Sequence, residues 1–385
     1  MGDAGGMTLI PATPSGHSLA DVMPSVAASL GVGLRGPLDL EPSADTVVVL
    51  IDGLGAELIR AHADEAPTLA ALTTRVITAG FPATTATSLT SLAVGAPCSQ
   101  HGIIGYSFRL TDAEGPVSFN PLRWTLESAG GPSALERFLP RDVQSMPSLL
   151  EILADSGVEI TYVMREVFRE SGLTRAAFRA EGHFRAVTTL DETARTITDV
   201  VARPSRARRF VYAYYGDLDM AGHLHGPGSD EWLDQLRDVD AFVAGLATDL
   251  PRDVRLVVTA DHGMVRADTP IDIDTHSTLL ANVRTVAGEA RVRHVYARPD
   301  AEQDVLHTWE SELAGHARVI SREQALDEHL FGPGRDHADR LGDVIAIASG
   351  NSVLTRSENE ELESSLRGHH GANTAAEQNI PLIIR

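Results

Sequence analysis

Short apolar runs alternate with amphipathic segments along most of the chain. Continuous runs of valine, isoleucine and leucine are typical of strands that are buried on both faces of a parallel sheet. The predicted strands cover residues 46–51, 158–163, 209–215 and 254–259. The predicted helices cover residues 67–75, 85–95, 148–156, 190–203 and 230–248. This alternation predicts an α/β fold with a mostly parallel central sheet and helices on both faces.

Two stretches interrupt the alternation. Residues 107–147 lack a clear period, so they predict a long irregular insertion of the kind that often shapes a binding site. Residues 266–345 predict a small inserted α+β cap. Its elements are predicted strands at 292–297 and 317–320 and predicted helices at 302–314 and 323–330.

The predicted cap divides the chain into two parts with approximate boundaries. The core covers residues 1–265 and 346–385, and the cap covers residues 266–345. A further predicted strand at 343–348 lies at this boundary, and we expect it to return to the core. Residues 380–385 predict a last strand or a strand edge, because Pro381 has no N–H group for a central ladder.

The composition is that of an ordinary soluble globular protein, with 43% hydrophobic and 22% charged residues. No stretch approaches about 18 consecutive apolar residues, so no membrane span is expected. The N-terminus lacks the basic start and apolar core of a signal peptide. The single cysteine, Cys98, excludes an internal disulfide and fits a reducing compartment. These features predict a cytoplasmic protein.

The formal net charge of −21 bears on the partners of the protein. A strongly negative field repels nucleic acids and anionic membranes, so we expect neither as a partner. An anionic substrate would need a locally positive site, yet the sequence has no strong cluster of lysine and arginine. Bound metal ions are the obvious alternative source of positive charge. The sequence leaves the oligomeric state open.

Acidic and imidazole side chains follow the ends of three predicted strands. Asp52, Asp219 and the pair Asp261–His262 each lie just past such an end, where open α/β sheets place their ligands. Asp219 and His223 stand four residues apart, so both side chains can reach one ion. A set of carboxylates and imidazoles suits zinc better than calcium or magnesium. These positions therefore predict a metal site.

The pattern alone leaves alternatives open. Asp217 competes with Asp219, and His225 competes with His223. Each segment also fits an ordinary turn, a helix cap or a polar loop with a surface histidine, and so does the pair His369–His370 between two glycines.

A hydroxyl-rich run after Pro82 predicts the start of a helix. A threonine at that junction lies where a helix N-terminus offers unpaired N–H groups and positive dipole charge. Thr84, Thr85 and Thr87 all lie near it, and each fits an ordinary N-cap when taken alone.

Five short segments, taken together, match the motifs of one superfamily in order. The matching residues are Asp52–Gly53; Phe81–Thr85 with Gly95; Asp219, Gly222, His223, Gly226 and Pro227; Ala260–Met264; and Gly368, His370 and Gly371. With the strand that precedes the first of them, they span residues 47–371, nearly the whole chain. This set resembles the alkaline phosphatase superfamily, and most closely its nucleotide pyrophosphatase/phosphodiesterase branch. The resemblance implies an alkaline phosphatase-like fold for the core.

The resemblance also implies two zinc ions. One zinc would be held by Asp52, Asp261 and His262 and by the hydroxyl oxygen of Thr85. The second would be held by Asp219, His223 and His370. The spacing to Gly95 implies that Thr85, rather than Thr84 or Thr87, is the nucleophile. Manganese or iron could occupy the same ligands.

The implied site fits the chemistry of phosphoryl transfer. A threonine hydroxyl is a weak nucleophile unless a metal lowers its pKa or a base stands beside it. Two metals about 4 Å apart can stabilise the attacking and leaving oxygens of an in-line displacement. Two zinc ions would also outweigh the charge of three carboxylates, so the site would attract a phosphate anion into an acidic protein.

One position departs from the family pattern. Tyr106 stands where the phosphodiesterase branch commonly has an asparagine that donates to a phosphoryl oxygen. The tyrosine hydroxyl could replace that donor as a substrate-binding group, or Tyr106 could line the pocket. The chain also lacks the sulfatase-type motif, which argues against sulfate esters.

Three hypotheses for the function follow. The leading one is a two-zinc hydrolase that cleaves small phosphate diesters or nucleotide pyrophosphates through a phospho-threonine intermediate. The second is a metal-dependent phosphomonoesterase or a hydrolase of a phosphonate such as phosphonoacetate, in which Arg109 or Arg123 would bind the additional negative charge. The third is a non-catalytic, metal-stabilised binding protein, which the presence of every expected ligand and of the hydroxyl nucleophile disfavours.

Overall fold

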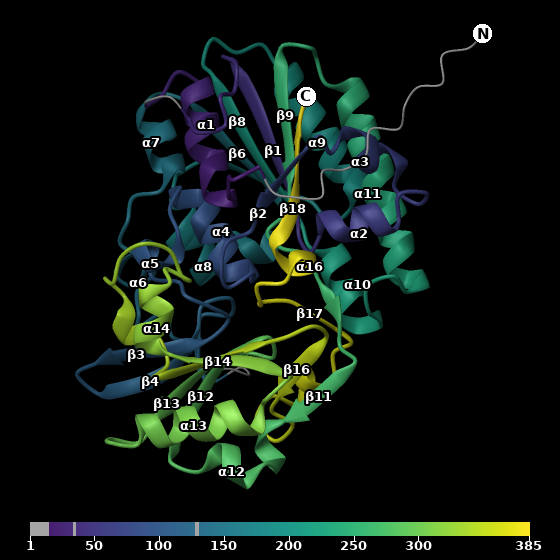
Figure 1. Ribbon diagram of the computed structural model, residues 1–385. Helices are drawn as coiled ribbons and strands as arrows, with labels where there is room; N and C mark the ends of the chain where they lie inside the picture. The colour runs from purple at the N-terminus through teal and green to yellow at the C-terminus, as the bar shows by residue number, and fades with distance from the viewer. Residues whose placement is uncertain (1–14, 34–35, 128–130) are drawn as a thin grey trace.

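The computed structural model describes residues 15–33, 36–127 and 131–385. Within these ranges the largest element is a seven-stranded sheet with the order β2-β18-β9-β1-β8-β6-β7 (Figure 1). Its strands are β1 (Asp45–Ile51), β2 (Arg75–Thr78), β6 (Glu159–Met164), β7 (His183–Ala186), β8 (Arg209–Tyr215), β9 (Val254–Thr259) and β18 (Asn379–Ile384). Five neighbouring strands, from β9 to β7, are parallel, and β18 is antiparallel to both of its neighbours. The predicted mostly parallel sheet is confirmed.

Helices cover both faces of this sheet (Figure 1). One face carries α1 (Val22–Ser29), α4 (Thr85–Val94) and α7 (Leu149–Asp155). The other carries α3 (Pro67–Leu72), α9 (Leu190–Ala202) and α11 (Asp230–Asp249). The two-faced α/β architecture is therefore also as predicted.

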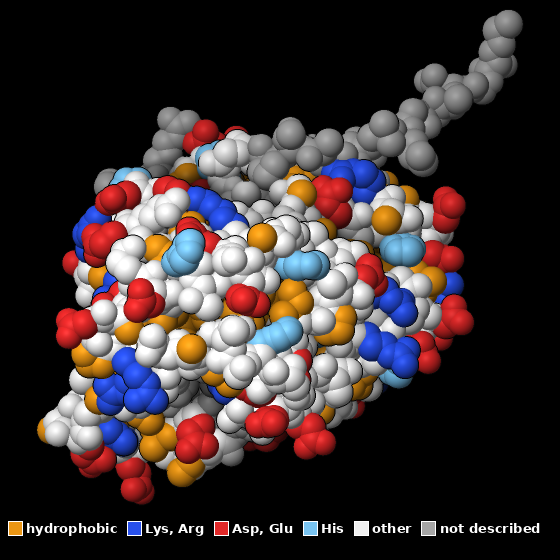
Figure 2. Space-filling model, turned by 60° about the horizontal axis from the view of Figure 1, so that its bottom comes forward, with side chains coloured by type: hydrophobic (Ala, Val, Ile, Leu, Met, Phe, Trp, Pro, Cys, Tyr) orange, Lys and Arg blue, Asp and Glu red, His pale blue; other side chains and the backbone are white. Residues whose placement is uncertain are grey.

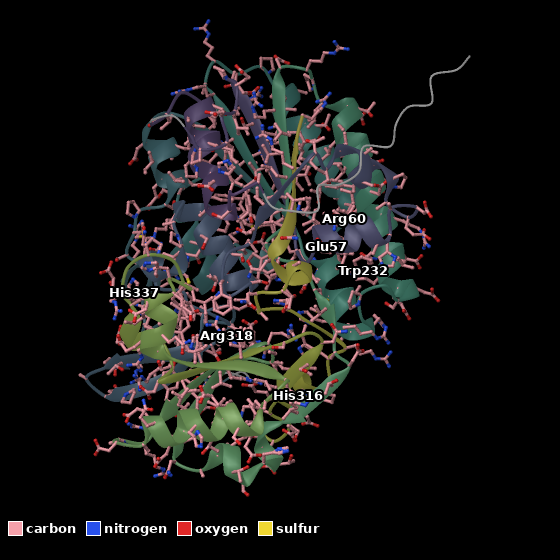
Figure 3. All side chains as sticks on the ribbon, viewed as in Figure 1. Glu57, Arg60, Trp232, His316, Arg318 and His337 are labelled. Atoms are coloured by element: carbon pink, nitrogen blue, oxygen red, sulfur yellow. The ribbon has the colours of Figure 1, made fainter. Side chains whose placement is uncertain are left out.

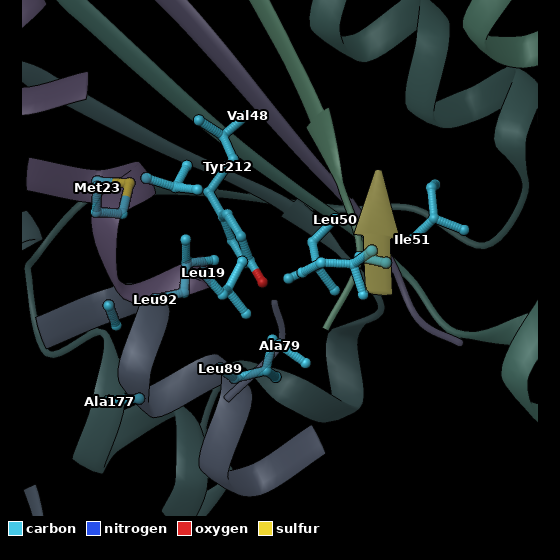
Figure 4. Close-up of a cluster of buried hydrophobic side chains, with 14 of the residues drawn as sticks. Leu19, Met23, Val48, Leu50, Ile51, Ala79, Leu89, Leu92, Ala177 and Tyr212 are labelled. Atoms are coloured by element: carbon cyan, nitrogen blue, oxygen red, sulfur yellow. The ribbon is translucent and has the colours of Figure 1, made fainter. Parts of the chain in front are cut away.

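The hydrophobic core lies between the helices and the sheet. Met23 of α1 and Leu92 of α4 belong to one buried cluster with Val48 and Tyr212 of the central strands (Figure 4). Each of these side chains is at most 1% exposed. Burying an aliphatic side chain of this size contributes about 1.5–3 kcal/mol, so this packing holds α4 firmly on the sheet.

The C-terminal end of α4 is fixed by a glycine. Gly95 has a φ of 71°, and a Cβ at this position would lie 2.7 Å from Cγ of Pro24. Both the left-handed backbone and the lack of space require glycine here. At the other end, Thr84 is the N-cap residue and Thr85 begins the helix. The first and last residues of α4 are thus well defined, and Thr85 lies at its first position.

Part of the insertion at 107–147 is regular, so the prediction of a wholly irregular segment was wrong. A small antiparallel sheet is formed by β3 (Phe108–Asp112), β4 (Gly115–Asn120) and β5 (Thr125–Leu126). The ring of Phe119 packs edge-on against Phe108 and Trp124, with centroids 5.6 and 4.9 Å away. These strands are too short, and have too few buried positions, to produce a visible period in the sequence.

A second unit is built on a four-stranded antiparallel sheet with the order β12-β13-β15-β14, in the lower part of Figure 1. Its strands are β12 (Val283–Glu289), β13 (Val292–Ala297), β14 (Ala317–Ser321) and β15 (Val344–Ala348). Helix α13 (Glu302–Glu312) packs on this sheet and buries Trp309 completely. Helix α14 (Arg322–Asp327) also contacts it. The strands and helices predicted for the cap are confirmed, with shifts at their ends.

Strand β15 belongs to this smaller sheet, so its expected return to the core was wrong. It pairs antiparallel with β13 and with β14. A run of five buried aliphatic residues fits the centre of either sheet, and only the pairing partners decide between them. The division into core and cap stays a prediction, although β15 crosses the boundary drawn at residue 345. Residues 1–14, where no signal peptide was expected, lie outside the described residues.

Charges are mixed on the surface. Acidic and basic side chains lie side by side on the face shown in Figure 2, and no large basic patch is visible there. Elsewhere, Arg60 pairs with Glu57, and Arg318 pairs with Glu328 (Figure 3). On the face shown in Figure 2, no broad basic surface is therefore available to bind an anion.

Candidate metal centre

The predicted acidic and histidine residues meet at the carboxyl edge of the central sheet. Asp52 directly follows β1, and Asp261–His262 follow β9 at a distance of one residue. Asp219 and His223 lie one turn apart on α10 (Asp217–His225), which follows β8. His370 follows β17 (Gly368–His369), a short strand that pairs with β10 (Val265–Arg266).

The turn after β9 depends on a close approach between two backbone segments. A Cβ on Gly263 would lie 2.0 Å from the carbonyl oxygen of Ala376. The Gly263 N–H donates to the carbonyl of Glu377, the residue after Ala376. Only glycine allows this approach, so Gly263 lets Asp261 and His262 turn into the site.

One group that could hold a metal ion consists of Asp219, His223 and His370. Nε2 of His223 lies 3.3 Å from Oδ2 of Asp219 and 3.2 Å from Nε2 of His370. Nε2 of His370 lies 3.9 Å from the other oxygen of Asp219. This is the set that the sequence assigned to the second ion.

A second group consists of Asp52, Asp219 and His262. Nε2 of His262 lies 3.3 Å from Oδ1 of Asp52 and 3.4 Å from Oδ2 of Asp261. Asp219 thus belongs to both groups. Asp261, which the resemblance assigned to the same ion as Asp52 and His262, is outside the second group but lies next to its His262. Because Oδ1 of Asp261 accepts hydrogen bonds from the N–H groups of Gly53 and His262, only Oδ2 remains for a cation.

Backbone carbonyls orient all three imidazoles. Nδ1 of His223 contacts the carbonyl of Gly368 at 2.8 Å, and Nδ1 of His370 contacts that of Ala83 at 2.9 Å. Nδ1 of His262 lies 3.1 Å from the carbonyl of Gly263. A carbonyl only accepts hydrogen bonds, so Nδ1 must carry the proton in each ring. In its neutral form, each of these imidazoles therefore presents the lone pair of Nε2, as a metal ligand requires.

The centre contains buried carboxylate oxygens that no described residue satisfies. Asp52 is 3% exposed and Asp261 is fully buried. Oδ1 of Asp52, Oδ1 of Asp219 and Oδ2 of Asp261 have no hydrogen-bond partner among the described residues. Burial, together with the charges of Asp261 and Asp219, raises the pKa of Asp52 well above its usual value. A bound cation would satisfy these oxygens and offset the cost of burying them, so the residues present fit a metal centre.

His223 and Asp219 form an ion pair in the protein without metal. Burial disfavours the charged imidazole, but the charge and hydrogen bond of Asp219 outweigh burial and raise the pKa of His223 to about 9. Burial alone would raise the pKa of Asp219. The charge of His223 and its hydrogen bond outweigh burial, so the pKa of Asp219 lies below its usual value. Protons and metal ions therefore compete for this pair.

Thr85 is the threonine whose hydroxyl faces the centre. Its Oγ1 lies 3.2 Å from Nε2 of His262, and the residue is 7% exposed. The hydroxyl of Thr87 donates instead to the carbonyl of Ile103 at 3.0 Å, and Thr84 is the N-cap. The geometry thus favours Thr85 as the nucleophile, a role that stays a prediction.

The competing candidates have other partners. Asp217 pairs with Arg165 at 2.6 Å, and His225 lies 3.6 Å from Glu231. Nε2 of His369 lies 3.1 Å from the carbonyl of Leu366. Two histidines that no motif included, His316 and His337, lie in other parts of the molecule (Figure 3).

Tyr106 lies at the site, but its hydroxyl is engaged. It donates to Oε1 of Glu363 at 3.0 Å, and Arg123 pairs with the same oxygen at 3.1 Å. Arg109, the other arginine considered for an anion, stacks on the ring of Tyr296 at 4.5 Å. Only Arg123 of the two lines a cavity at the site.

Sequence reasoning missed Tyr214, the residue that holds Asp52. Its hydroxyl donates to Oδ2 of Asp52 from the end of β8. Burial raises the pKa of Tyr214 well above its usual value, so the phenol keeps its proton. Nothing in the sequence distinguishes this tyrosine from its neighbours in the apolar run, although its place at a strand end was a usable signal.

Two cavities of more than 200 Å³ meet at Thr85. The first, here called the cap-side cavity, measures about 240 Å³ and lies between the metal centre and the smaller sheet; the second, the sheet-side cavity, measures about 270 Å³ and includes Phe168 and Tyr214. The two cavities share four of their lining residues: Thr85, Leu122, Asp219 and Met220. A group bonded at Thr85 can therefore extend in two directions.

The parallel sheet, the Asp and His groups at its carboxyl edge and the buried hydroxyl define an α/β protein with a candidate metal centre for phosphate chemistry. A family model described as type I phosphodiesterase / nucleotide pyrophosphatase matches residues 46–373. The chain belongs to this family, as its motifs indicated.

Curated relatives are similar over parts of the chain. Bis(5'-adenosyl)-triphosphatase enpp4 of Xenopus laevis is 24% identical over 185 residues, which cover 46% of this chain and 38% of that protein. Human ectonucleotide pyrophosphatase/phosphodiesterase family member 7 is 36% identical over 63 residues, 15% of this chain and 14% of that protein. The chain thus spans well under two thirds of the relatives that it matches.

Solved structures share the fold over most of the chain. Murine ectonucleotide pyrophosphatase/phosphodiesterase 5 has a TM-score of 0.66 at 17% identity and covers 88% of this chain and 87% of its own. Phosphonoacetate hydrolase from Sinorhizobium meliloti 1021, solved with phosphonoacetate, has a TM-score of 0.67 at 18% identity and covers 92% of both chains. The murine protein has also been solved with AMP. These likenesses show the alkaline phosphatase-like fold.

Among the described residues, no helix combines the length and apolarity needed to span a bilayer. The cytoplasmic location stays a prediction.

Proposed function

We propose that this protein is a two-zinc hydrolase that cleaves phosphate diesters or nucleotide pyrophosphates. The observation that carries the proposal is the position of Thr85 Oγ1, 3.2 Å from Nε2 of His262 at the first turn of α4. It lies beside two groups of candidate ligands that share Asp219. Membership of the phosphodiesterase family supports a phosphoric ester hydrolase.

We assign one ion to Asp52, Asp261, His262 and Thr85, and the other to Asp219, His223 and His370. The unpartnered carboxylate oxygens and the oriented Nε2 atoms support this assignment. Bound zinc supplies positive charge that stabilises the attacking and leaving oxygens of the displacement. Manganese or iron would suit the same donors.

Thr85 attacks the phosphorus through Oγ1. As the Oγ1–P bond forms, the bond from phosphorus to the leaving oxygen breaks, and the hydroxyl proton passes to water. The leaving oxygen keeps the bonding electron pair and departs, and an alkoxide takes up a proton from water. Water then adds to the phospho-threonine, and Oγ1 departs and regains a proton, so that one water is consumed for each ester bond. The unpaired N–H groups at the start of α4 place positive dipole charge beside this oxygen.

A phosphomonoesterase or a phosphonoacetate-type hydrolase is the second candidate, because Arg123 lines the cap-side cavity. We favour the diester for two reasons. Arg123 is already paired with Glu363, and a monoester carries one more negative charge than a diester. The two cavities at Thr85 also offer room for the two substituents of a diester. We infer that Tyr106 lines the substrate pocket, since its hydroxyl is used by Glu363.

A substrate panel tests the proposal. Bis(p-nitrophenyl) phosphate, a dinucleoside polyphosphate, p-nitrophenyl phosphate and phosphonoacetate are compared with the protein loaded with zinc, manganese or iron. The expected result is a higher kcat/KM for the first two. Preference for the monoester or the phosphonate would support the second candidate. Bound metal without turnover of any substrate would instead support the remote alternative, a non-catalytic metal-stabilised binding protein.

A further inference from the structure

The cap-side cavity contains carboxylates that the proposed chemistry does not use. Glu289 comes from the end of β12. Glu360 is the N-cap residue of α15 (Glu361–Ser364), and Glu363 lies on that helix. All three line the cavity in which His223 and His370 also lie. Arg123 is the arginine that lines this cavity, and no lysine lines it in the described part of the chain.

Two of these carboxylates keep an oxygen without a partner. Glu360 is 2% exposed, and its Oε2 pairs with Arg293 at 2.8 Å, while its Oε1 has no hydrogen-bond partner in the described chain. Oε1 of Glu289 also lacks one, and no ion pair involves Glu289 among the described residues. A buried acceptor left in this state costs free energy. Both oxygens therefore indicate a donor that binds from the cavity.

The mouth of the same cavity is apolar. Four large hydrophobic side chains that line it are exposed by 39–59%: Leu122, Met220, Leu224 and Leu362. They come from three separate segments of the chain, which this cavity brings together. Exposed apolar side chains gathered at one mouth mark a binding surface for an apolar group.

We propose that the cap-side cavity binds a substituent of the phosphodiester that carries an ammonium group on an aliphatic arm. The ammonium donates hydrogen bonds to Glu289 and Glu360, and the arm covers the leucine and methionine side chains at the mouth. The phosphoryl group would then lie at the metal centre and the ammonium beside the unpartnered oxygens of Glu289 and Glu360. This inference rests on the proposed phosphodiesterase function.

The test uses two diesters of the same shape. The zinc-loaded full-length protein is given 2-aminoethyl p-nitrophenyl phosphate and n-propyl p-nitrophenyl phosphate at pH 9. At this pH the amine is still protonated, and Glu289 is a carboxylate although burial raises its pKa to about 8. The p-nitrophenyl ring can occupy the sheet-side cavity. A hydrogen bond to a charged group predicts that kcat/KM for the aminoethyl ester is about tenfold or more above that for the propyl ester.

Matched variants locate the effect. Glu289→Gln, which keeps the shape and removes the charge, should lower the ratio of the two kcat/KM values toward one. Glu360→Gln should do the same, and it provides a second test at the other acceptor. Glu361→Gln changes the exposed neighbour that does not line the cavity, so its ratio should match the wild type.

The outcomes separate the two proposals. Equal hydrolysis of both diesters by the wild type, or a preference that survives in both Glu289→Gln and Glu360→Gln, overturns the ammonium site and leaves the phosphodiesterase standing. If the wild type hydrolyses neither these diesters nor bis(p-nitrophenyl) phosphate, the proposed function itself is wrong, and the ammonium site falls with it.

Discussion

Arg291 and Glu377 form a fully buried ion pair with two parallel hydrogen bonds, Nε to Oε1 at 2.9 Å and Nη2 to Oε2 at 2.8 Å. Arg291 immediately precedes β13 of the smaller sheet, and Glu377 lies on α16 (Ala375–Gln378). Oε1 of Glu377 also accepts the N–H of Ala372 at 2.9 Å. The pair thus ties the smaller sheet to the loop that carries His370.

Replacing Arg291 by methionine should destabilise the protein by about 3–5 kcal/mol, because it leaves the Glu377 carboxylate buried without a partner. Urea unfolding of the metal-free protein measures this loss. Arg318→Met, which breaks a half-exposed pair with Glu328, should cost no more than about 1 kcal/mol. Equal losses in the two variants would show that the buried pair has no special role.

Thr85→Ala should reduce phosphodiester turnover to the level of the buffer, since the hydroxyl is the proposed nucleophile. The zinc content measured by elemental analysis should stay nearly the same, because six Asp and His ligands remain. Thr87→Ala is the matched control on the same helix. It loses one buried hydrogen bond to Ile103, worth about 1 kcal/mol, and should keep its turnover. Activity that persists in Thr85→Ala would exclude this threonine as the nucleophile.

The sequence was sufficient to predict the main strands and the site that they carry. β8 and β9 were predicted to the residue, and β1 to within one, because an aspartate follows each apolar run within two residues. The Asp and His residues beyond those ends meet because parallel strands end at one edge of a sheet. Sequence spacing left Asp217 as a rival of Asp219, and the ion pair of Asp217 with Arg165 now accounts for it.

What the sequence could not predict depends on partners far away in the chain. β15 has the apolar run of a core strand, and its place in the smaller sheet follows only from pairing with β13 and β14. Tyr214 orients Asp52 across 162 residues. Glu289 reaches the cavity only because β12 ends beside it. In each case the local sequence does not specify the partner, because the partner comes from a distant part of the chain.

Gly95→Ala should destabilise the protein by about 2–4 kcal/mol, combining the cost of a left-handed backbone with that of overpacking. The φ of 71° and the 2.7 Å approach to Pro24 are the reasons. Gly245→Ala is the control, because Gly245 lies inside α11 and a Cβ there would meet nothing within 4 Å. That variant should gain about 0.5–1 kcal/mol. The urea midpoints of both variants measure these changes in stability. A Gly95→Ala variant as stable as the wild type would contradict the prediction.

Zinc affinity should rise with pH and level off near pH 9. In the metal-free protein Asp219 raises the pKa of His223 to about 9, so below that pH the imidazole carries a proton that zinc must displace. For each proton that zinc displaces, the zinc affinity rises about tenfold per pH unit. The raised pKa of Asp52 can make this dependence of affinity on pH steeper.

Competition with a zinc chelator between pH 6 and 10 measures this slope, and proton release on binding can be followed by calorimetry in two buffers. His225→Gln is a suitable control, because His225 lies beside Glu231 and outside the metal groups, so the slope should not change. His223→Gln should weaken binding and lower the slope by about one proton. An affinity that is constant from pH 6 to 9 would mean that His223 does not hold a proton that the metal replaces.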